Sequence, residues 1–428
     1  MRPKPCSLDT LRRSLWRRLR ERPRVGRGRA GRRLVPWREQ VEDRVLLSEF
    51  RVNTFTGLQQ DPVVAVDSVG NHVVIWNSFG QDGSEWGIFG QRFNAAGVPQ
   101  GSEFQVSTYV TGFQFQPAVA MDASGDFVVT WSSLDQDGDL FGVYAQRFNA
   151  SGVAQGSEFR VNVQTTGRQR GASVAMDSDG DFVVAWQSGG QDGDNWGIFA
   201  RRYNAAGVAQ GGEFQVNNFT TGNQHRPSIA INATGSFVVT WESENQDNSG
   251  DAVYARRYNA AGTAQGAEFR VNSSTTDHQV LPAVAMDAAG DFVVAWSSQG
   301  QDGSGYGVYA QRYNPSGVPQ GGEFRVNSFT TGDQGGWSLD RFTISASMDA
   351  AGNFAIGWRS FDQDGSGYGA YAQRYSAGGA LRGSEFRLNT STADDQLNPA
   401  IALDADGDLV AVWTSSDTRT STLFPGFG

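Results

Sequence analysis

The sequence predicts an all-β protein, a seven-bladed β-propeller made of four-stranded repeats of about 55 residues and closed by its N-terminal strand. First, one segment of the type Glu-Phe-hydrophobic recurs along the chain. Second, each full repeat contains four segments of strand type, bounded by Gly, Pro, Asn or Asp. Third, no repeat contains a helical period with capping residues. Four antiparallel strands per repeat are typical of a propeller, whose sheets pack face to face around an axis.

The repeat is visible from the spacing of one glutamate. The recurring residues are Glu49, Glu103, Glu158, Glu213, Glu268, Glu323 and Glu385, at spacings of 54, 55, 55, 55, 55 and 62. The last spacing includes an insertion of about seven residues around 335–341. A fixed period of this kind indicates one supersecondary unit that is stacked repeatedly.

The fifth repeat illustrates the four expected strands, EFRVN (268–272), PAVAMD (282–287), DFVVAWSS (291–298) and GVYAQRYN (307–314). The second and third of these are joined by a short loop that ends in Gly290, which can adopt the left-handed conformation of a tight hairpin. In DFVVAW the residues of both faces are apolar. A strand buried on both faces belongs to a stacked architecture in which neighbouring sheets cover each other.

The two ends of the repeat region predict how the ring closes. If PAVAMD is the first strand of a blade, residues 49–53 have no blade of their own, and the last repeat (399–404, 408–413) lacks a fourth strand. We therefore expect residues 49–53 to pair beside 408–413 and its neighbours. The third strand of that blade has lost its pattern, so either residues 423–427 are a poor substitute or the chain is a fragment of a longer repeat protein.

Composition and charge divide the chain into an arginine-rich leader, residues 1–44, and a repeat domain, residues 45–428. The leader carries 15 Lys and Arg against 5 Asp and Glu, which leaves 20 basic against 40 acidic residues in the domain. The leader lacks a pattern that could bury apolar surface, so we expect it to be disordered. The acidic domain disfavours nucleic acid as its partner. No apolar run is long enough to span a membrane, and the single cysteine, Cys6, excludes a disulfide framework.

Two short patterns resemble known families. Residues 41–48, VEDRVLLS, resemble the EDRxLL tag that follows basic leaders in large exported repeat proteins of certain bacteria. The PAVAMDxxGDFVVAW hairpin resembles the NHL-type propeller hairpin, and the unit length is similar to that of the 55-residue repeats of very large exported bacterial proteins. These resemblances imply a propeller fold and a secreted or cell-envelope location.

The acidic loops between the DFVVAWSS-type and GVYAQRYN-type segments, which are the second and third strands of a blade that begins with PAVAMD, are candidate calcium sites. Hard cations favour oxygens at alternate positions with a Gly at the bend, and two loops approach this spacing. Their carboxylates are Asp135, Asp137, Asp139, Asp362 and Asp364. No loop has the bidentate Glu of an EF-hand, and an Asp-Gly turn between strands is the alternative interpretation. No cofactor is certain, and calcium is possible.

Aromatic residues follow these loops and are candidate ligand-binding residues. They are Trp86, Trp196, Tyr306 and Tyr368, with Phe141 at the same position and Asp251 as the exception in the fourth repeat. Rings beside Asp and Ser side chains could stack on sugars; alternatively, each ring caps the edge of its blade. Trp337, in the insertion, is a further candidate because it is not repeated.

These features favour a non-enzymatic, exported binding or structural module that contacts extracellular polysaccharide or protein. One alternative is a polysaccharide-active enzyme at the axial face, and another is a calcium-stabilised adhesion scaffold. The sequence contains no common hydrolase or phosphate-binding motif, and its three histidines, His72, His225 and His278, stand at non-equivalent repeat positions. The enzyme alternative requires non-repeated acidic or histidine side chains to gather at one central pocket.

Overall fold

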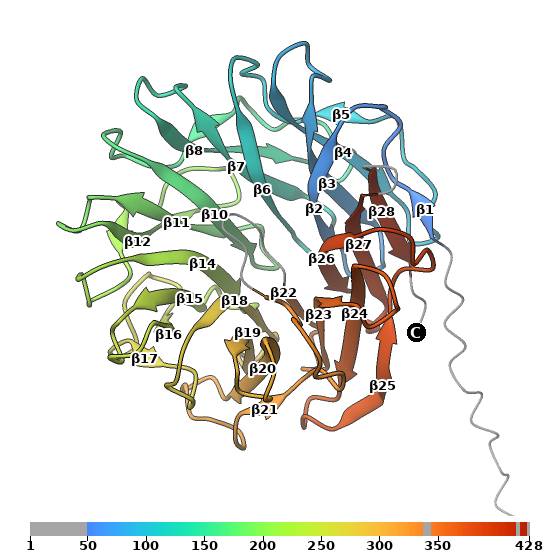
Figure 1. Ribbon diagram of the computed structural model, residues 1–428. Coiled ribbons are helices and arrows are strands. Elements are labelled where there is room, and N and C mark those ends of the chain that lie inside the picture. The colour runs from blue at the N-terminus through green and yellow to red at the C-terminus, as the bar shows by residue number, and fades with distance from the viewer. Residues whose placement is uncertain (1–48, 337–343, 417–419, 426–428) are drawn as a thin grey trace, which may run out of the picture. The chain divides into compact units, whose positions relative to one another are not determined.

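The computed structural model describes residues 49–336 and 344–416, and the backbone of 420–425 (Figure 1). The chain divides into two units, residues 1–44 and 45–428, and all the described residues belong to the second. The leader, its tag-like motif and Trp337 lie outside the described residues. Within those residues no helix is long and apolar enough to cross a membrane.

The described strands form seven sheets of four strands each. The first sheet contains β2 (Gln59–Val66), β3 (His72–Phe79), β4 (Trp86–Phe93) and β5 (Phe104–Gln105). The second contains β6 (Gln114–Met121), β7 (Phe127–Leu134), β8 (Phe141–Phe148) and β9 (Phe159–Arg160). The third contains β10 (Gln169–Met176), β11 (Phe182–Gly189), β12 (Trp196–Tyr203) and β13 (Phe214–Gln215). The fourth contains β14 (Gln224–Ile231), β15 (Phe237–Glu244), β16 (Asp251–Tyr258) and β17 (Phe269–Arg270).

The fifth sheet contains β18 (Gln279–Met286), β19 (Phe292–Gln299), β20 (Tyr306–Tyr313) and β21 (Phe324–Arg325). The sixth contains β22 (Ile344–Met348), β23 (Phe354–Phe361), β24 (Tyr368–Tyr375) and β25 (Leu381–Arg387). The last contains β26 (Gln396–Leu403), β27 (Leu409–Ser415), β28 (Thr420–Pro425) and β1 (Phe50–Arg51). Six sheets therefore come from one continuous segment each, and one combines both ends of the described chain.

The sheets are arranged around a central axis, with the first strand of each sheet innermost (Figure 1). This confirms the predicted all-β propeller. In the composite sheet, β28 lies between β27 and β1, and Phe50 pairs with Leu423. Residues 49–53 therefore do not lie directly beside 408–413. The third strand of this sheet is Thr420–Pro425, although its sequence lacks the repeat pattern.

The fourth strand is shorter than EFRVN predicts in most sheets. In the fourth sheet it covers Phe269–Arg270 alone. The Val271 N–H still donates to the Val253 carbonyl at 2.8 Å, but the Val253 N–H donates to the Asn272 side-chain Oδ1, also at 2.8 Å. The asparagine side chain thus replaces a backbone acceptor and ends the ladder.

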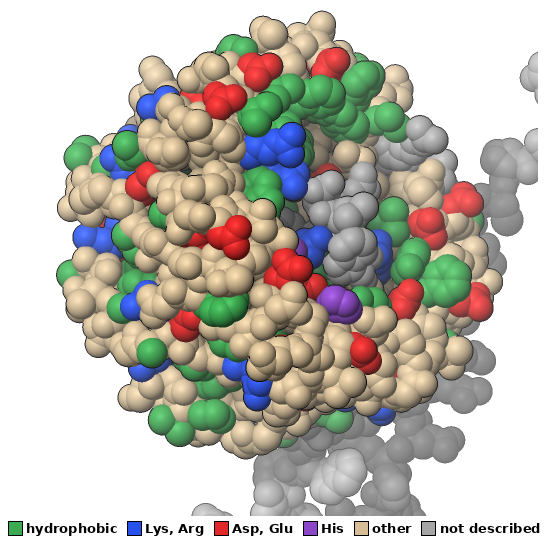
Figure 2. Space-filling view, turned by 60° about the vertical axis from the view of Figure 1, so that its left-hand side comes forward, with side chains coloured by type: hydrophobic (Ala, Val, Ile, Leu, Met, Phe, Trp, Pro, Cys, Tyr) green, Lys and Arg blue, Asp and Glu red, His purple; other side chains and the backbone are tan. Residues whose placement is uncertain are grey.

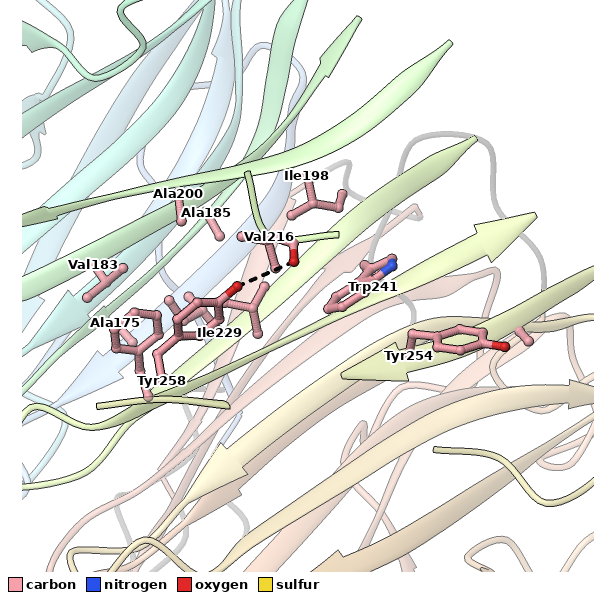
Figure 3. Close-up of a cluster of buried hydrophobic side chains, with 13 residues drawn as sticks. Ala175, Val183, Ala185, Ile198, Ala200, Val216, Ile229, Trp241, Tyr254 and Tyr258 are labelled. Carbon is pink, nitrogen blue, oxygen red and sulfur yellow. Dashed lines mark hydrogen bonds between the residues drawn. The ribbon is translucent and has the colours of Figure 1, made fainter. Parts of the chain in front are cut away.

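The hydrophobic core consists of clusters that each join two neighbouring sheets. One cluster lies between the third and fourth sheets and includes Ile198, Val216 and Trp241 (Figure 3). Another joins the first sheet to the composite sheet through Val52, Trp76 and other residues. The second strands supply a fully buried tryptophan in every sheet, namely Trp76, Trp131, Trp186, Trp241, Trp296, Trp358 and Trp413. The predicted burial of both faces of this strand is confirmed.

Buried tyrosines at the ends of third strands should make the free energy of unfolding fall at alkaline pH. Tyr258 stacks on Phe237 with ring centroids 4.8 Å apart, and its hydroxyl donates to the Val216 carbonyl at 3.4 Å (Figure 3). Burial, as the largest cause, raises the pKa of Tyr258 to about 12, and likewise that of Tyr203.

Because the folded state holds these protons more tightly, their contribution to stability is complete below the ordinary tyrosine pKa of about 10 and is lost as pH rises through about 12. We expect the free energy of unfolding to fall across this window, together with late ionisation of tyrosine measured by absorbance at 295 nm. Tyr258→Phe should reduce the alkaline loss. A domain whose stability is flat from pH 9 to 12 would contradict this.

Candidate functional site

The first strands carry a bulge at one end of the ring, which we call the loop face because the loops from second to third strands lie there. The strand register shifts at this bulge in six sheets. The residues in the bulges, which we call the rim residues, are Asp61, Gln116, Gly171, Arg226, Leu281 and Asn398, all with φ between 52° and 64°. Positive φ is costly for residues other than glycine and is often found at functional positions.

The preceding sheet holds several of these bulges in place. The Leu281 N–H donates to Glu242 Oε1 at 2.6 Å, and the Arg226 N–H donates to Gln187 Oε1 at 3.0 Å. A serine can serve the same purpose, since the Gly171 N–H donates to Ser132 Oγ at 3.1 Å. Hydrogen bonds between sheets therefore fix the backbone of the rim, and the rim side chains differ from one sheet to the next.

The rim opens onto a cavity along the axis. The innermost strands of all seven sheets line it, with Pro, Ala and Val forming much of the wall. Asp61, Gln116 and Asn398 add polar groups. Neighbouring rim side chains bind each other, since Asn398 Nδ2 donates to Asp61 Oδ1 at 2.8 Å.

The four repeated aromatic candidates occupy equivalent places on the loop face, each as the first residue of a third strand and each half-buried. Trp86 packs edge-on against Phe79, with centroids 5.4 Å apart. The guanidinium of Arg170 lies 5.2 Å from the Trp196 ring, and that of Arg359 lies 4.4 Å from the Tyr368 ring. The Tyr306 hydroxyl is 3.4 Å from Gln299 Oε1. Their role in binding a ligand stays a prediction.

The calcium candidates lie in tight turns of the loop face. Asp137 Oδ2 accepts a hydrogen bond from Asn162 Nδ2 at 3.3 Å, and Asp139 Oδ2 accepts one from the Gly167 N–H at 2.9 Å. Asp364 Oδ2 similarly accepts one from Asn389 Nδ2 at 3.2 Å. Asp135 and Asp362 are exposed and have positive φ. These bonds fit the turn interpretation, and calcium binding stays a prediction.

The fourth sheet differs from the others at three positions, and these differences meet in space. Asp251 replaces the aromatic ring. Glu242, on β15, stands where the other sheets have uncharged residues or Arg359. His225, on β14, pairs directly with Glu242 in the strand register. The histidine Nε2 lies 3.5 Å from Glu242 Oε2 and 3.8 Å from Asp251 Oδ1.

Further charged groups surround this cluster. Arg226 Nη1 donates to Glu242 Oε2 at 2.7 Å, and the Glu242 side chain is fully buried. From the fifth sheet, His278 places its Nδ1 2.9 Å from Asp251 Oδ2. Figure 2 shows a histidine in purple beside acidic side chains in red at the central hollow. Unlike ionisable groups therefore gather at one point near the axis.

Two pKa shifts describe the electrostatics of this cluster. Burial raises the pKa of Asp251, but hydrogen bonds and charge interactions with His225 and then His278 outweigh it, so that the pKa is lowered. Burial, as the largest cause, raises the pKa of Tyr306 to about 12, and the carboxylates of Asp333, Asp251 and Glu242 add to this effect. At neutral pH the cluster thus presents an ionised Asp251 beside a protonated tyrosine.

Sequence analysis named Asp251, His225 and His278 but did not bring them together, and it missed Glu242 and Arg226. It treated Asp251 as an exception that would not bind ligand, and His225 and His278 as unrelated histidines. The available signal was that one repeat departs from the others at several positions at once. His72 lies elsewhere: it is buried, stacks on Phe93 at 5.2 Å, and its Nδ1 is 3.0 Å from the Gly70 carbonyl oxygen.

Comparison with known proteins identifies the fold alone. No family model matches the chain, and no curated protein matches it. Among solved structures, a protein of unknown function from Dyadobacter fermentans has a TM-score of 0.50 at 11% identity, covering 79% of this chain and 96% of its own. A Penicillium chrysogenum alpha-L-arabinanase complexed with arabinobiose has a TM-score of 0.48 at 14% identity, covering 73% and 92%. A Hadza microbial sialidase has a TM-score of 0.45 at 10% identity, covering 80% of this chain and 73% of its own.

Proposed function

We propose that this chain is a non-enzymatic binding module that holds an extracellular polysaccharide on its loop face. The observation that carries the proposal is the placement of Trp86, Trp196, Tyr306 and Tyr368 at equivalent, half-buried positions around one end of the ring. Export is proposed with it, on the resemblance of residues 41–48 to an export-associated tag.

The chemistry of the loop face suits a polyhydroxylated ligand. An aromatic face packs against the C–H groups of a sugar ring, while neighbouring polar side chains fix its orientation. Phe79 and Phe361 extend the apolar surface beside Trp86 and Tyr368, and they are 43% and 44% exposed. The rim supplies carboxylate, amide and guanidinium groups close to the axis.

Equivalent weak sites on several sheets would act together on a polymer. Avidity raises the affinity for a chain that spans two or more sites, whereas a monosaccharide engages one site weakly. The fourth sheet, with Asp251 in place of the ring, is not one of these sites.

The test is retention of the full chain on a panel of polysaccharides by affinity electrophoresis. Trp86→Ala combined with Trp196→Ala should abolish retention while the melting temperature and near-UV circular dichroism remain those of a folded ring. Replacing both tryptophans by Phe, which occurs naturally at position 141, should preserve much of it. If the alanine variant unfolds, the rings are packing residues; if it folds and still binds, the site lies elsewhere, with Trp337 the next candidate.

A polysaccharide-active enzyme is the second candidate, because non-repeated ionisable groups gather around Asp251. Common glycosidase mechanisms use two carboxyl groups that flank the bond to be cleaved. Glu242 suits this role poorly, since it is fully buried and both of its oxygens accept hydrogen bonds. Release of reducing ends from a bound polysaccharide, and its loss in Asp251→Asn, would support the enzyme instead.

A further inference from the structure

We propose that His225, Glu242 and Asp251 form a binding site for one divalent transition-metal ion, with Zn²⁺ as the best-suited ion. In the described part of the chain, this is the group of three ligand-bearing side chains whose ligand atoms all lie within 4.8 Å of one another. The inference is independent of the proposed polysaccharide binding.

The distances are close to those that a metal ion requires. In a tetrahedral zinc site with bonds of about 2.0–2.1 Å, two ligand atoms lie about 3.3 Å apart. The His225 Nε2 atom is 3.5 Å from Glu242 Oε2 and 3.8 Å from Asp251 Oδ1. Shifts of a few tenths of an ångström would bring each carboxylate oxygen to the tetrahedral separation from the histidine nitrogen. The ligand atoms of Glu242 and Asp251 lie within 4.8 Å of each other, so these two carboxylates must also approach each other by up to about 1.5 Å. Three protein ligands leave a fourth position for water or a bound molecule.

The ligand types favour a transition metal over calcium. An imidazole nitrogen is a good ligand for Zn, Ni, Co and Fe, whereas Ca²⁺ requires six or more oxygens. Each carboxylate also has a second partner that fixes its orientation, as is usual around metal sites. The Leu281 N–H binds Glu242 Oε1 at 2.6 Å, and His278 Nδ1 lies 2.9 Å from Asp251 Oδ2.

Arg226 opposes the ion electrostatically, but it does not block it. Its guanidinium donates to Glu242 Oε2 at 2.7 Å, and a carboxylate oxygen has a second lone pair that can bind a metal. Two carboxylates and one guanidinium leave a net charge of -1 when the histidines are neutral. A divalent cation is therefore attracted to the cluster.

The internal repeat provides a second, independent observation. Glu242 and Asp251 replace residues that are not carboxylates in the other repeats, and these changes occur in the repeat that supplies His225. The strand register brings all three to the same end of one sheet. Substitutions without a common function would fall at scattered positions of the repeat. A bound ligand requires its ligating side chains to lie together.

The test is titration of the chelator-treated full chain with Co²⁺ and Zn²⁺, followed by visible absorption and calorimetry. We expect one Co²⁺ per chain, displacement by Zn²⁺, and no displacement by millimolar Ca²⁺. His225→Gln, which copies Gln60 of the first repeat, should weaken binding at least about 100-fold, and His278→Asn about 10-fold. His72→Phe, which copies Phe127, removes a distant histidine and should bind as the wild type does.

Three results would overturn the proposal. The first is a wild-type chain that binds neither ion with a dissociation constant below about 0.1 mM. This constant corresponds to a binding free energy of about −5.5 kcal/mol. The second is equal affinity in the wild type and a folded His225→Gln variant. The third is ready displacement of Co²⁺ by Ca²⁺, which would indicate binding at the oxygen-rich loops.

Discussion

Deletion of residues 1–53 should lower the melting temperature of the whole propeller, whereas deletion of residues 1–40 should leave it unchanged. The longer deletion removes β1, which pairs with β28 in the composite sheet. It also removes Val52, 5% exposed, and Phe50, which packs 5.6 Å from Phe93 of the first sheet. Val52 contributes about 1.5–3 kcal/mol of burial free energy, and the partly buried Phe50 adds to it.

The effect should extend beyond the lost strand, because β1 connects the ends of the described chain. Glu49 Oε2 also accepts a hydrogen bond from the Thr390 N–H at 2.8 Å. Differential scanning calorimetry of both truncations measures the difference directly. Adding a peptide of residues 45–56 should partly restore the stability of the longer deletion. Equal melting temperatures would show that the N-terminal strand does not stabilise the ring.

Glu242→Ser should destabilise the protein by about 3 kcal/mol, the lower end of the range for breaking a buried ion pair. Ser132 shows that serine at this position can still accept the bulge amide of the next sheet, at 3.1 Å. The loss therefore comes from removing the carboxylate opposite Arg226, which is 12% exposed. Urea unfolding measures the change.

The repeats also supply a compensating variant. Leu281 occupies the position equivalent to Arg226 at φ 58°, so leucine is compatible with this backbone. Arg226→Leu combined with Glu242→Ser should recover most of the lost stability, because no charge is then left without its partner. If the double variant is as unstable as Glu242→Ser alone, the ion pair does not explain the loss.

Much of the fold could be predicted because the repeat is expressed in local patterns. The period, the alternation in DFVVAW and the turn glycines are properties of neighbouring residues, and they correctly predicted four-stranded sheets with Trp241 and its equivalents in the core. The two-residue fourth strands were not predicted, because the Asn272 side chain replaces backbone pairing. The third strand of the composite sheet was predicted only as one of two alternatives, at residues 423–427, whereas it covers Thr420–Pro425. Its pairing depends on its neighbours more than on its own pattern.

The amino-acid sequence by itself determined the all-β class, the repeat boundaries and the tryptophan core, since period and apolar alternation act within a few residues of one another. Only the tertiary structure decided that His225, Glu242 and Asp251 meet, with His278 from the next sheet beside them. Strand register sets which residues are opposite, and the first-strand bulge shifts that register near the rim. Packing of adjacent sheets then brings together side chains that no local pattern relates.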